Sequence, residues 1–187
     1  MGYDHPLSDD EKRELLRIAR ATIREYLSSG RLPPGSPHKD TLIMPGGAFV
    51  SLHIQGELRG CIGTFAETDP LFRTVQQMAI SAATRDPRFD QLAPEEIPAI
   101  EIEISVLSSL TPVKDPAEVE VGKHGLHVSR GRLRGVLLPQ VATEHGWDRA
   151  TFLEQTCRKA GLPADAWQLE GTEIEVFTAQ VFSEQKL

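Results

Sequence analysis

Cys61 stands in a short segment whose neighbours could make its thiol reactive. Arg59 precedes it by two residues, and in a strand this spacing puts both side chains on one face, about 7 Å apart. A guanidinium beside a thiol favours the thiolate, which is the nucleophilic form. Gly60 and Gly63 flank the cysteine, and glycines in a strand let a ligand approach the backbone. The segment therefore predicts a nucleophilic or ligand-contacting thiol.

A packing role for the same cysteine stays open, because free cysteine is among the most frequently buried residue types. The second cysteine, Cys157, lies in an apolar stretch with Leu153 and Ala160 and is expected to be an inert packing residue. The two cysteines form no CxxC motif, so the sequence predicts neither a disulfide framework nor a zinc ribbon.

Two segments with a similar pattern each offer a histidine and an arginine. A three-residue loop at 55–57 would place His53 opposite Arg59, and a two-residue turn at 130–131 would place His127 opposite Arg134. Shifting the first register by one residue would move Cys61 to the apolar face, so the predicted site depends on this register. The matching segments are Leu52-His53-Ile54 before Gly56-Glu57-Leu58-Arg59-Gly60, and Leu126-His127-Val128 before Gly131-Arg132-Leu133-Arg134-Gly135.

Basic residues gather where acidic ones are missing. The range Val121–Thr143 contains no Asp or Glu, although the whole chain has a net charge of −7. Such a local basic surface attracts a carboxylate or a phosphate. Arg59 and Arg134 lie inside predicted strands and are the better candidates to bind it, whereas Arg130 and Arg132 fit a solvated hairpin tip.

The elements that must position these residues follow from hydrophobic periodicity and from turn residues. Ser8 and Glu11 form a predicted capping box, and Asp69 is the expected cap of a second helix with Pro70 at its first position. The Pro-rich loop from Gly30 to Asp40 marks a candidate lobe boundary. Helices are expected at 9–30, 70–85 and 148–160, and strands at 48–54, 58–65, 100–106, 126–129, 133–138 and 173–182. This order predicts an α+β fold with a mainly antiparallel sheet flanked by helices.

The composition excludes several classes of protein. The chain has 187 residues, of which 40% are hydrophobic and 25% are charged, as in ordinary globular domains. Its excess of acidic residues makes nucleic-acid binding an unfavourable hypothesis. The longest uncharged stretch, Thr41–Gly56, is too short and too interrupted to span a membrane. The acidic N-terminus does not fit a signal peptide, so we expect a cytoplasmic protein.

No cofactor or metal site is expected. The sequence has neither a P-loop nor a GxGxxG motif. His124 and His127 should lie on opposite faces of a turn and strand, which does not suit a shared metal ion.

The segment Leu58-Arg59-Gly60-Cys61-Ile62-Gly63-Thr64-Phe65 resembles the LRGCIG hallmark of the AMMECR1 family. The resemblance covers nearly the whole chain and implies a single AMMECR1-like domain, a two-lobed α/β fold whose signatures gather around a cleft. It also places Gln140 among the expected ligand-binding residues. The further signatures are Asp86-Pro87-Arg88-Phe89, His124-Gly125-Leu126, Leu137-Leu138-Pro139-Gln140-Val141 and Gly146-Trp147. In bacteria and archaea, the resemblance implies a set with a Memo-like protein and a radical-SAM protein.

The leading hypothesis is a protein that binds or acts on a small anionic metabolite in this cleft. Cys61 would be the nucleophile or contact thiol, and His124 or His53 would carry the proton. The expected ligand-binding residues are Arg59, Gly60, Gly63, Arg134 and Gln140. The alternative is a non-catalytic adaptor that docks the Memo-like or radical-SAM partner. Whether the protein is an enzyme stays open at this point.

Overall fold

The computed structural model describes residues 5–35 and 37–187. Its chain divides into two compact units. The first unit contains the described residues up to Leu107 together with Gln180–Leu187, and the second contains Ser108–Ala179. The described residues of the loop from Gly30 to Asp40 belong to the first unit, so the lobe boundary expected there is wrong. That loop instead connects α1 of the first unit to the short 3-10 helix at Asp40–Ile43.

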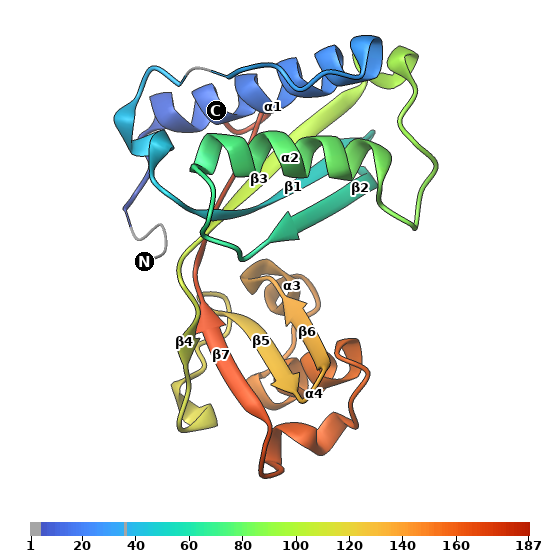
Figure 1. The fold of residues 1–187 in the computed structure, drawn as a ribbon. Coiled ribbons are helices and arrows are strands. Elements are labelled where there is room, and N and C mark those ends of the chain that lie inside the picture. The colour runs from blue at the N-terminus through green and yellow to red at the C-terminus, as the bar shows by residue number, and fades with distance from the viewer. Residues whose placement is uncertain (1–4, 36) are drawn as a thin grey trace. The chain divides into compact units, whose positions relative to one another are not determined.

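The first unit is a four-stranded sheet with two helices on one face (Figure 1). Its strand order is β2-β1-β3-β8, and β1 pairs antiparallel with both β2 and β3. A 3-10 helix at Pro94–Glu96 precedes β3. The elements are α1 (Asp9–Ser29), β1 (Gly47–Ile54), β2 (Glu57–Thr64), α2 (Leu71–Thr84), β3 (Ile100–Leu107) and β8 (Ala179–Ser183).

Helix α1 begins and ends where its sequence predicts. The Ser8 hydroxyl accepts the backbone N–H of Glu11, and the Glu11 carboxylate accepts the backbone N–H of Ser8 at 2.7 Å. This reciprocal capping box satisfies donors that the first turn leaves unpaired. Gly30 ends the helix in the left-handed conformation, with φ of 69°, which a glycine adopts without steric cost.

Helix α2 begins one residue later than expected. Pro70 is its N-cap, and the Pro70 carbonyl accepts the N–H of Thr74 at 3.0 Å. Asp69 is therefore not the cap. The helix ends at Thr84 because Pro87 disfavours helical geometry for the residue before it.

The helices cover the even-numbered face of the sheet. Val50, Leu52 and Ile102 are fully buried there against apolar side chains of α1 and α2. The odd-numbered face of β1 carries Ser51 and His53, which are only partly buried. The alternation of apolar and polar residues thus separates a core face from a face that can hold chemistry.

The register of the first hairpin is confirmed in its centre and wrong at its turn. Ser51 lies opposite Cys61, as expected. The turn, however, has two residues, Gln55 and Gly56, with φ of 53° and 82°. Positive φ at both positions is typical of the tight turn that matches strand twist. Arg59 is the extra residue of a β-bulge, so His53 pairs with Leu58 and the predicted His53–Arg59 pair is wrong.

The second unit contains a second four-stranded sheet, with the order β4-β7-β5-β6. One face packs on α3 and α4 around the fully buried side chains of Leu126, Val128 and Phe152. The 3-10 helices of this unit lie at Pro116–Glu118 and Ala164–Gln168. The other elements are β4 (Thr111–Pro112), β5 (Gly125–Arg130), β6 (Leu133–Leu137), α3 (Pro139–Glu144), α4 (Arg149–Lys159) and β7 (Glu173–Phe177).

The second hairpin turns one residue later than predicted. Gly131 and Arg132 form the turn, with φ of 62° at Gly131. Ser129 therefore lies opposite Arg134, and His127 lies opposite Val136. The predicted His127–Arg134 pair is wrong, although both side chains remain on one face because the register moved by two residues.

The expected closing strand at 173–182 is two strands. Glu173–Phe177 belongs to the sheet of the second unit, and Ala179–Ser183 belongs to the sheet of the first. Continuous alternation in the sequence does not reveal that Thr178 separates them. The fold class is confirmed: both units combine antiparallel strand pairs with covering helices. Among the described residues, no helix has the length and apolar character needed to cross a membrane.

Candidate functional site

Cys61 lies on β2 with its thiol partly buried. Its cross-strand neighbour Ser51 donates a hydrogen bond from Oγ to Sγ at 3.2 Å. The confirmed register thus places a hydroxyl beside the cysteine.

The backbone of Cys61 is held from outside the sheet. Strand β2 is an edge of the sheet, so half of its backbone groups find no partner strand. The Asp86 carboxylate accepts the N–H of Cys61 at 2.8 Å, and Nη2 of Arg88 donates to the Cys61 carbonyl at 3.3 Å. Two side chains from the loop after α2 therefore replace the missing strand at this residue.

Asp86 and Arg88 form an ion pair of their own. Arg88 donates to the carboxylate through Nη2 at 2.7 Å and through Nε at 3.0 Å. The Asp86 side chain is only 2% exposed. These bonds from Arg88, together with the Cys61 N–H, lower the pKa of Asp86 to about 2 despite its burial.

Arg88 is therefore the cation that binds the backbone of Cys61. The pKa of Arg88 is raised, first by its hydrogen bonds to Asp86 and in addition by the Cys61 side chain. The sequence predicted that Arg59 would be the cation beside Cys61. Arg88 appeared there only as part of a family signature. Arg88 is 27 residues from Cys61, so strand spacing carries no signal for the contact.

Arg59 points to a different partner. The β-bulge turns it toward the segment before β3, where Nε and Nη2 donate to Glu96, both at 2.9 Å. Nη1 donates to the Asp90 carbonyl at 2.8 Å, and the side chain is 19% exposed. These bonds lower the pKa of Glu96. Arg59 therefore neutralises a carboxylate instead of facing the sulfur.

The space beside the two flanking glycines is filled by the protein. A side chain at Gly60 would collide with the backbone carbonyl of Ala82 on α2, and one at Gly63 would collide with the Phe49 ring. Close packing against a helix and a ring accounts for both glycines. The packing therefore fills the space beside Gly60 and Gly63 in which a ligand was expected to approach the backbone.

His53 lies on the same face as Cys61, diagonally across the β1–β2 pair. It is two residues from Ser51 along β1 and is partly buried. Diagonal neighbours in antiparallel strands are about 7 to 8 Å apart, which is within reach of a long ligand but too far for a direct hydrogen bond.

His124, Arg134 and Gln140 belong to the second unit, whereas Cys61, His53 and Arg59 belong to the first. Arg134 is exposed and lies opposite Ser129, five residues along β5 from His124, which corresponds to roughly 17 Å. The structure therefore does not bring His124 and Arg134 together. The buried Gln140 Oε1 has no donor among the residues described.

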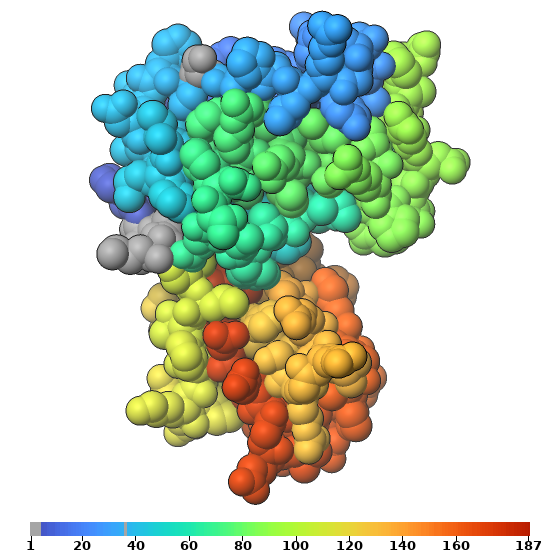
Figure 2. Space-filling view, in the orientation of Figure 1, coloured from blue at the N-terminus to red at the C-terminus, as the bar shows by residue number. Residues whose placement is uncertain are grey.

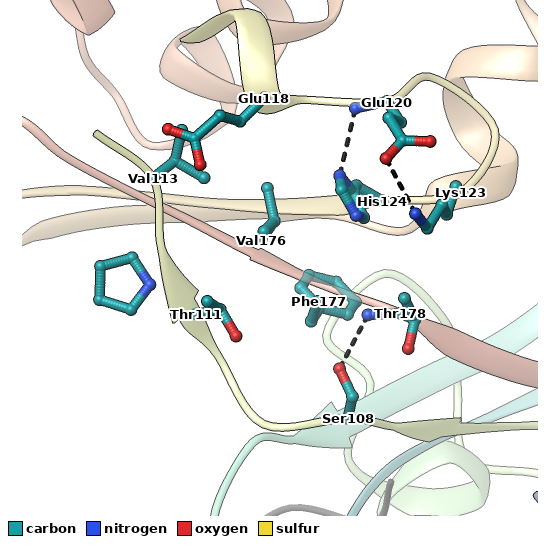
Figure 3. Close-up of a pocket in the computed structure, with 11 residues that line it drawn as sticks. Ser108, Thr111, Val113, Glu118, Glu120, Lys123, His124, Val176, Phe177 and Thr178 are labelled. Carbon is teal, nitrogen blue, oxygen red and sulfur yellow. Dashed lines mark hydrogen bonds and ion pairs between the residues drawn. The ribbon is translucent and has the colours of Figure 1, made fainter. Parts of the chain in front are cut away.

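His124 lines a pocket of about 470 Å³ in the second unit (Figure 3). Its Nδ1 accepts the backbone N–H of Glu120 at 3.1 Å. In the part of the chain that the structure describes, no three side chains of the His, Cys, Asp and Glu types cluster as metal ligands would.

Comparisons with known proteins agree with this architecture. The chain matches the AMMECR1 family profile over residues 16–182. A protein of Methanothermobacter thermautotrophicus is 47% identical over 96% of this chain and 97% of its own length, and one of Methanopyrus kandleri is 44% identical over 96% and 91%. The crystal structure of the uncharacterized protein PH0010 from Pyrococcus horikoshii superposes with a TM-score of 0.89 at 39% identity, covering 96% of this chain and 94% of that one. The chain therefore belongs to the AMMECR1 family.

Proposed function

We propose that the protein binds a small anionic ligand beside Cys61, with Arg88 as the cation and the Cys61 thiol as contact group and nucleophile. The hydrogen bonds of Arg88 to the Asp86 carboxylate and to the Cys61 carbonyl carry this proposal. Nε and Nη2 of Arg88 already donate hydrogen bonds to Asp86 and to the Cys61 carbonyl. The Nη1 group has no bond to a described residue, and the side chain is 55% exposed. Arg88 thus keeps donors for a carboxylate or phosphate.

The neighbours of Cys61 support nucleophilic chemistry. The Ser51 hydroxyl donates to the sulfur and Arg88 binds the carbonyl of the same residue, so a donor and a cation both lie near the proposed nucleophile. His53 lies on the same face as Cys61 and is the proton carrier of this proposal. Cys61 and Cys157 are both free thiols, which fits the cytoplasmic location that forms part of this proposal.

Two alkylating reagents of nearly equal size test the proposal. Iodoacetate carries a negative charge and iodoacetamide carries none, and with either one the thiolate forms a C–S bond while iodide leaves. An anion site beside the sulfur raises the rate with iodoacetate relative to iodoacetamide above the ratio for free cysteine. Inorganic phosphate should protect Cys61 from both reagents.

Variants test whether Arg88 causes the preference for iodoacetate. Arg88→Ala should return the rate ratio to that of free cysteine, and Cys61→Ser should abolish labelling. Cys157 is an internal control, because burial raises the pKa of its thiol and keeps it unreactive. An iodoacetate preference that is absent, or that survives in Arg88→Ala, contradicts the proposal.

A second candidate function is the non-catalytic adaptor. The tip of the β5–β6 hairpin carries Leu133, which is 47% exposed, between the exposed Arg130, Arg132 and Arg134. This hairpin forms part of the visible surface of the second unit (Figure 2, gold). An exposed leucine among arginines suits an acidic partner surface with an apolar centre.

Co-purification distinguishes the two functions. For an adaptor, binding of purified Memo-like or radical-SAM protein persists in the Arg59→Ala and Cys61→Ser variants but is lost in an Arg130→Glu, Leu133→Ser double variant. Loss of binding in Cys61→Ser instead, with the hairpin variant unaffected, would place the partner at the cysteine and contradict docking through the tip.

A further inference from the structure

The pocket around His124 is a second site, separate in its chemistry from the cysteine. Every residue that lines it belongs to the second unit. It lies between β4, the 3-10 helix at Pro116–Glu118, the start of β5 and the end of β7 (Figure 3). The lining residues are Ser108, Thr111, Pro112, Val113, Glu118, Glu120, Lys123, His124, Val176, Phe177 and Thr178.

Hydrogen bonds hold the rim of the pocket in place. Ser108 and Thr178 are joined twice, from Ser108 N–H to the Thr178 carbonyl at 3.0 Å and from Thr178 N–H to Ser108 Oγ at 2.9 Å. The carbonyl of the buried Val119 accepts Nε of Arg149 at 2.8 Å, which ties the loop before β5 to α4. The pocket is therefore formed before any ligand arrives, and binding requires little ordering.

His124 presents a fixed donor to this pocket. Because its Nδ1 accepts the N–H of Glu120, the proton of the neutral ring must be on Nε2. The His124 N–H also donates to the Glu120 carbonyl at 2.9 Å, which closes the turn around the ring. Nε2–H is then the group that His124 can offer to a hydrogen-bond acceptor on a ligand.

The charges of the lining residues leave one carboxylate without a cation. Lys123 and Glu120 pair with each other at 2.8 Å, and this hydrogen bond lowers the pKa of Glu120. Glu118 uses Oε1 to accept the backbone N–H of Asp115 at 2.9 Å. No cation in the described ranges pairs with Glu118. The unneutralised charge in the pocket is therefore negative.

The floor of the pocket is apolar and rigid. Pro112 is exposed and Val113 is partly buried in the lining, whereas Val176 and Phe177 are 9% and 2% exposed. Gly125 packs directly on the Phe177 ring, since a side chain at that position would overlap it. The glycine after His124 therefore lets the Phe177 ring pack closely under the start of β5. The accessible parts of Pro112 and Val113 can bind an apolar ligand body by removing it from water.

We propose that this pocket binds a small organic cation, a protonated amine on an apolar body, with the amine at Glu118 and the body on Pro112 and Val113. An acceptor on the ligand would take the hydrogen bond from Nε2 of His124. The ligand proposed here is a cation, whereas the ligand proposed at Cys61 is an anion. Either site can therefore be tested without the other.

Tyramine and 4-hydroxyphenylacetate form a matched pair of probes. Both have an aromatic ring and a hydroxyl, but one carries an ammonium group and the other a carboxylate. Titration of the ¹⁵N-labelled full chain at pH 7.5 should give tyramine-dependent shifts at the amides of 120–125 and 176–178. 4-Hydroxyphenylacetate at the same concentration should leave these amides unshifted.

Glu118→Gln tests the assigned charge. Glutamine keeps an acceptor oxygen for the Asp115 N–H, so the local fold is preserved while the charge is removed. Tyramine affinity should fall about threefold to fivefold, as expected for an exposed ion pair. Glu170→Gln, an exposed site in the same unit, is the matched control. Equal shifts from both probes, or unchanged tyramine affinity in Glu118→Gln, would overturn the proposal.

Discussion

The carboxylate of Asp86 accepts the backbone N–H of Cys61 at 2.8 Å, across 25 residues of sequence. Asp86 therefore does for the edge strand what a neighbouring strand does elsewhere in a sheet. Because Arg88 binds both Asp86 and the Cys61 carbonyl, the three residues form one connected network. The position of the thiol depends on this network.

Asp86→Asn should destabilise the first unit. The substitution removes the charge that accepts bonds from Arg88 and from the Cys61 N–H, and such charged hydrogen bonds contribute about 1.5 to 3 kcal/mol each when buried. We expect a loss of about 2 kcal/mol in the free energy of unfolding in urea. Asp90→Asn, at an exposed carboxylate in the same loop, is the control and should change the free energy of unfolding little.

The contribution of Asp86 should depend on pH. Its pKa is about 2 in the folded protein against 3.8 ordinarily, so the folded state favours the charged form. This shift contributes about 2 kcal/mol to the free energy of unfolding. The contribution is complete above about pH 5 and is lost as the pH falls through the folded pKa. Urea unfolding at pH 7, 4, 3 and 2 should show the wild type and Asp86→Asn converging toward pH 2. A difference that stays constant over this range would exclude this mechanism.

Ser51→Ala should slow alkylation of Cys61. The variant removes the hydroxyl that donates to sulfur at 3.2 Å. A net hydrogen bond of about 1 kcal/mol corresponds to roughly a fivefold loss in the rate with iodoacetamide at pH 7.5. Ser28→Ala, at an exposed serine of α1, is the control. An unchanged rate would mean that the hydroxyl does not stabilise the thiolate.

Arg59 and Glu96 should be coupled in stability but not in thiol reactivity. A double-mutant cycle with Arg59→Ala and Glu96→Ala should give a coupling free energy of about 1 kcal/mol, because the pair is bidentate and partly buried. The iodoacetamide rate at Cys61 should stay within twofold of wild type in Arg59→Ala. A large fall in that rate would restore Arg59 to the cysteine site.

Gly60→Ala should destabilise the first unit without altering any charge. The added methyl group would collide with the Ala82 carbonyl on α2, and a backbone neighbour cannot move aside as a flexible side chain can. Overpacking of this kind costs about 1 to 3 kcal/mol. Thermal unfolding measures the loss, and Glu57→Ala, at an exposed position of the same strand, serves for comparison. A wild-type midpoint for Gly60→Ala would show that strand and helix can separate at low cost.

Local patterns predicted those features that depend on neighbours in sequence. The capping box of Ser8 and Glu11, the stop at Gly30 and the alternation along β3 all appear as expected. Side-chain parity also placed Ser51 opposite Cys61. Turn length was the weak point, because a turn of two residues with a bulge and a turn of three residues fit the same letters. Because of this ambiguity, Arg59 was expected opposite His53, whereas it lies in the bulge and pairs with Glu96.

The sequence by itself determined the three longer helices, the strand faces and the family, because caps, periodicity and the LRGCIG segment are local, but it missed the short helix α3. Only the tertiary structure decided which cation reaches Cys61, since Arg88 comes from a loop 27 residues away. It also decided that Gly60 serves packing and that His124 lines a pocket whose unpaired charge is Glu118. Contacts between distant segments depend on how helices and strands pack together, and residue spacing within one strand does not contain that information.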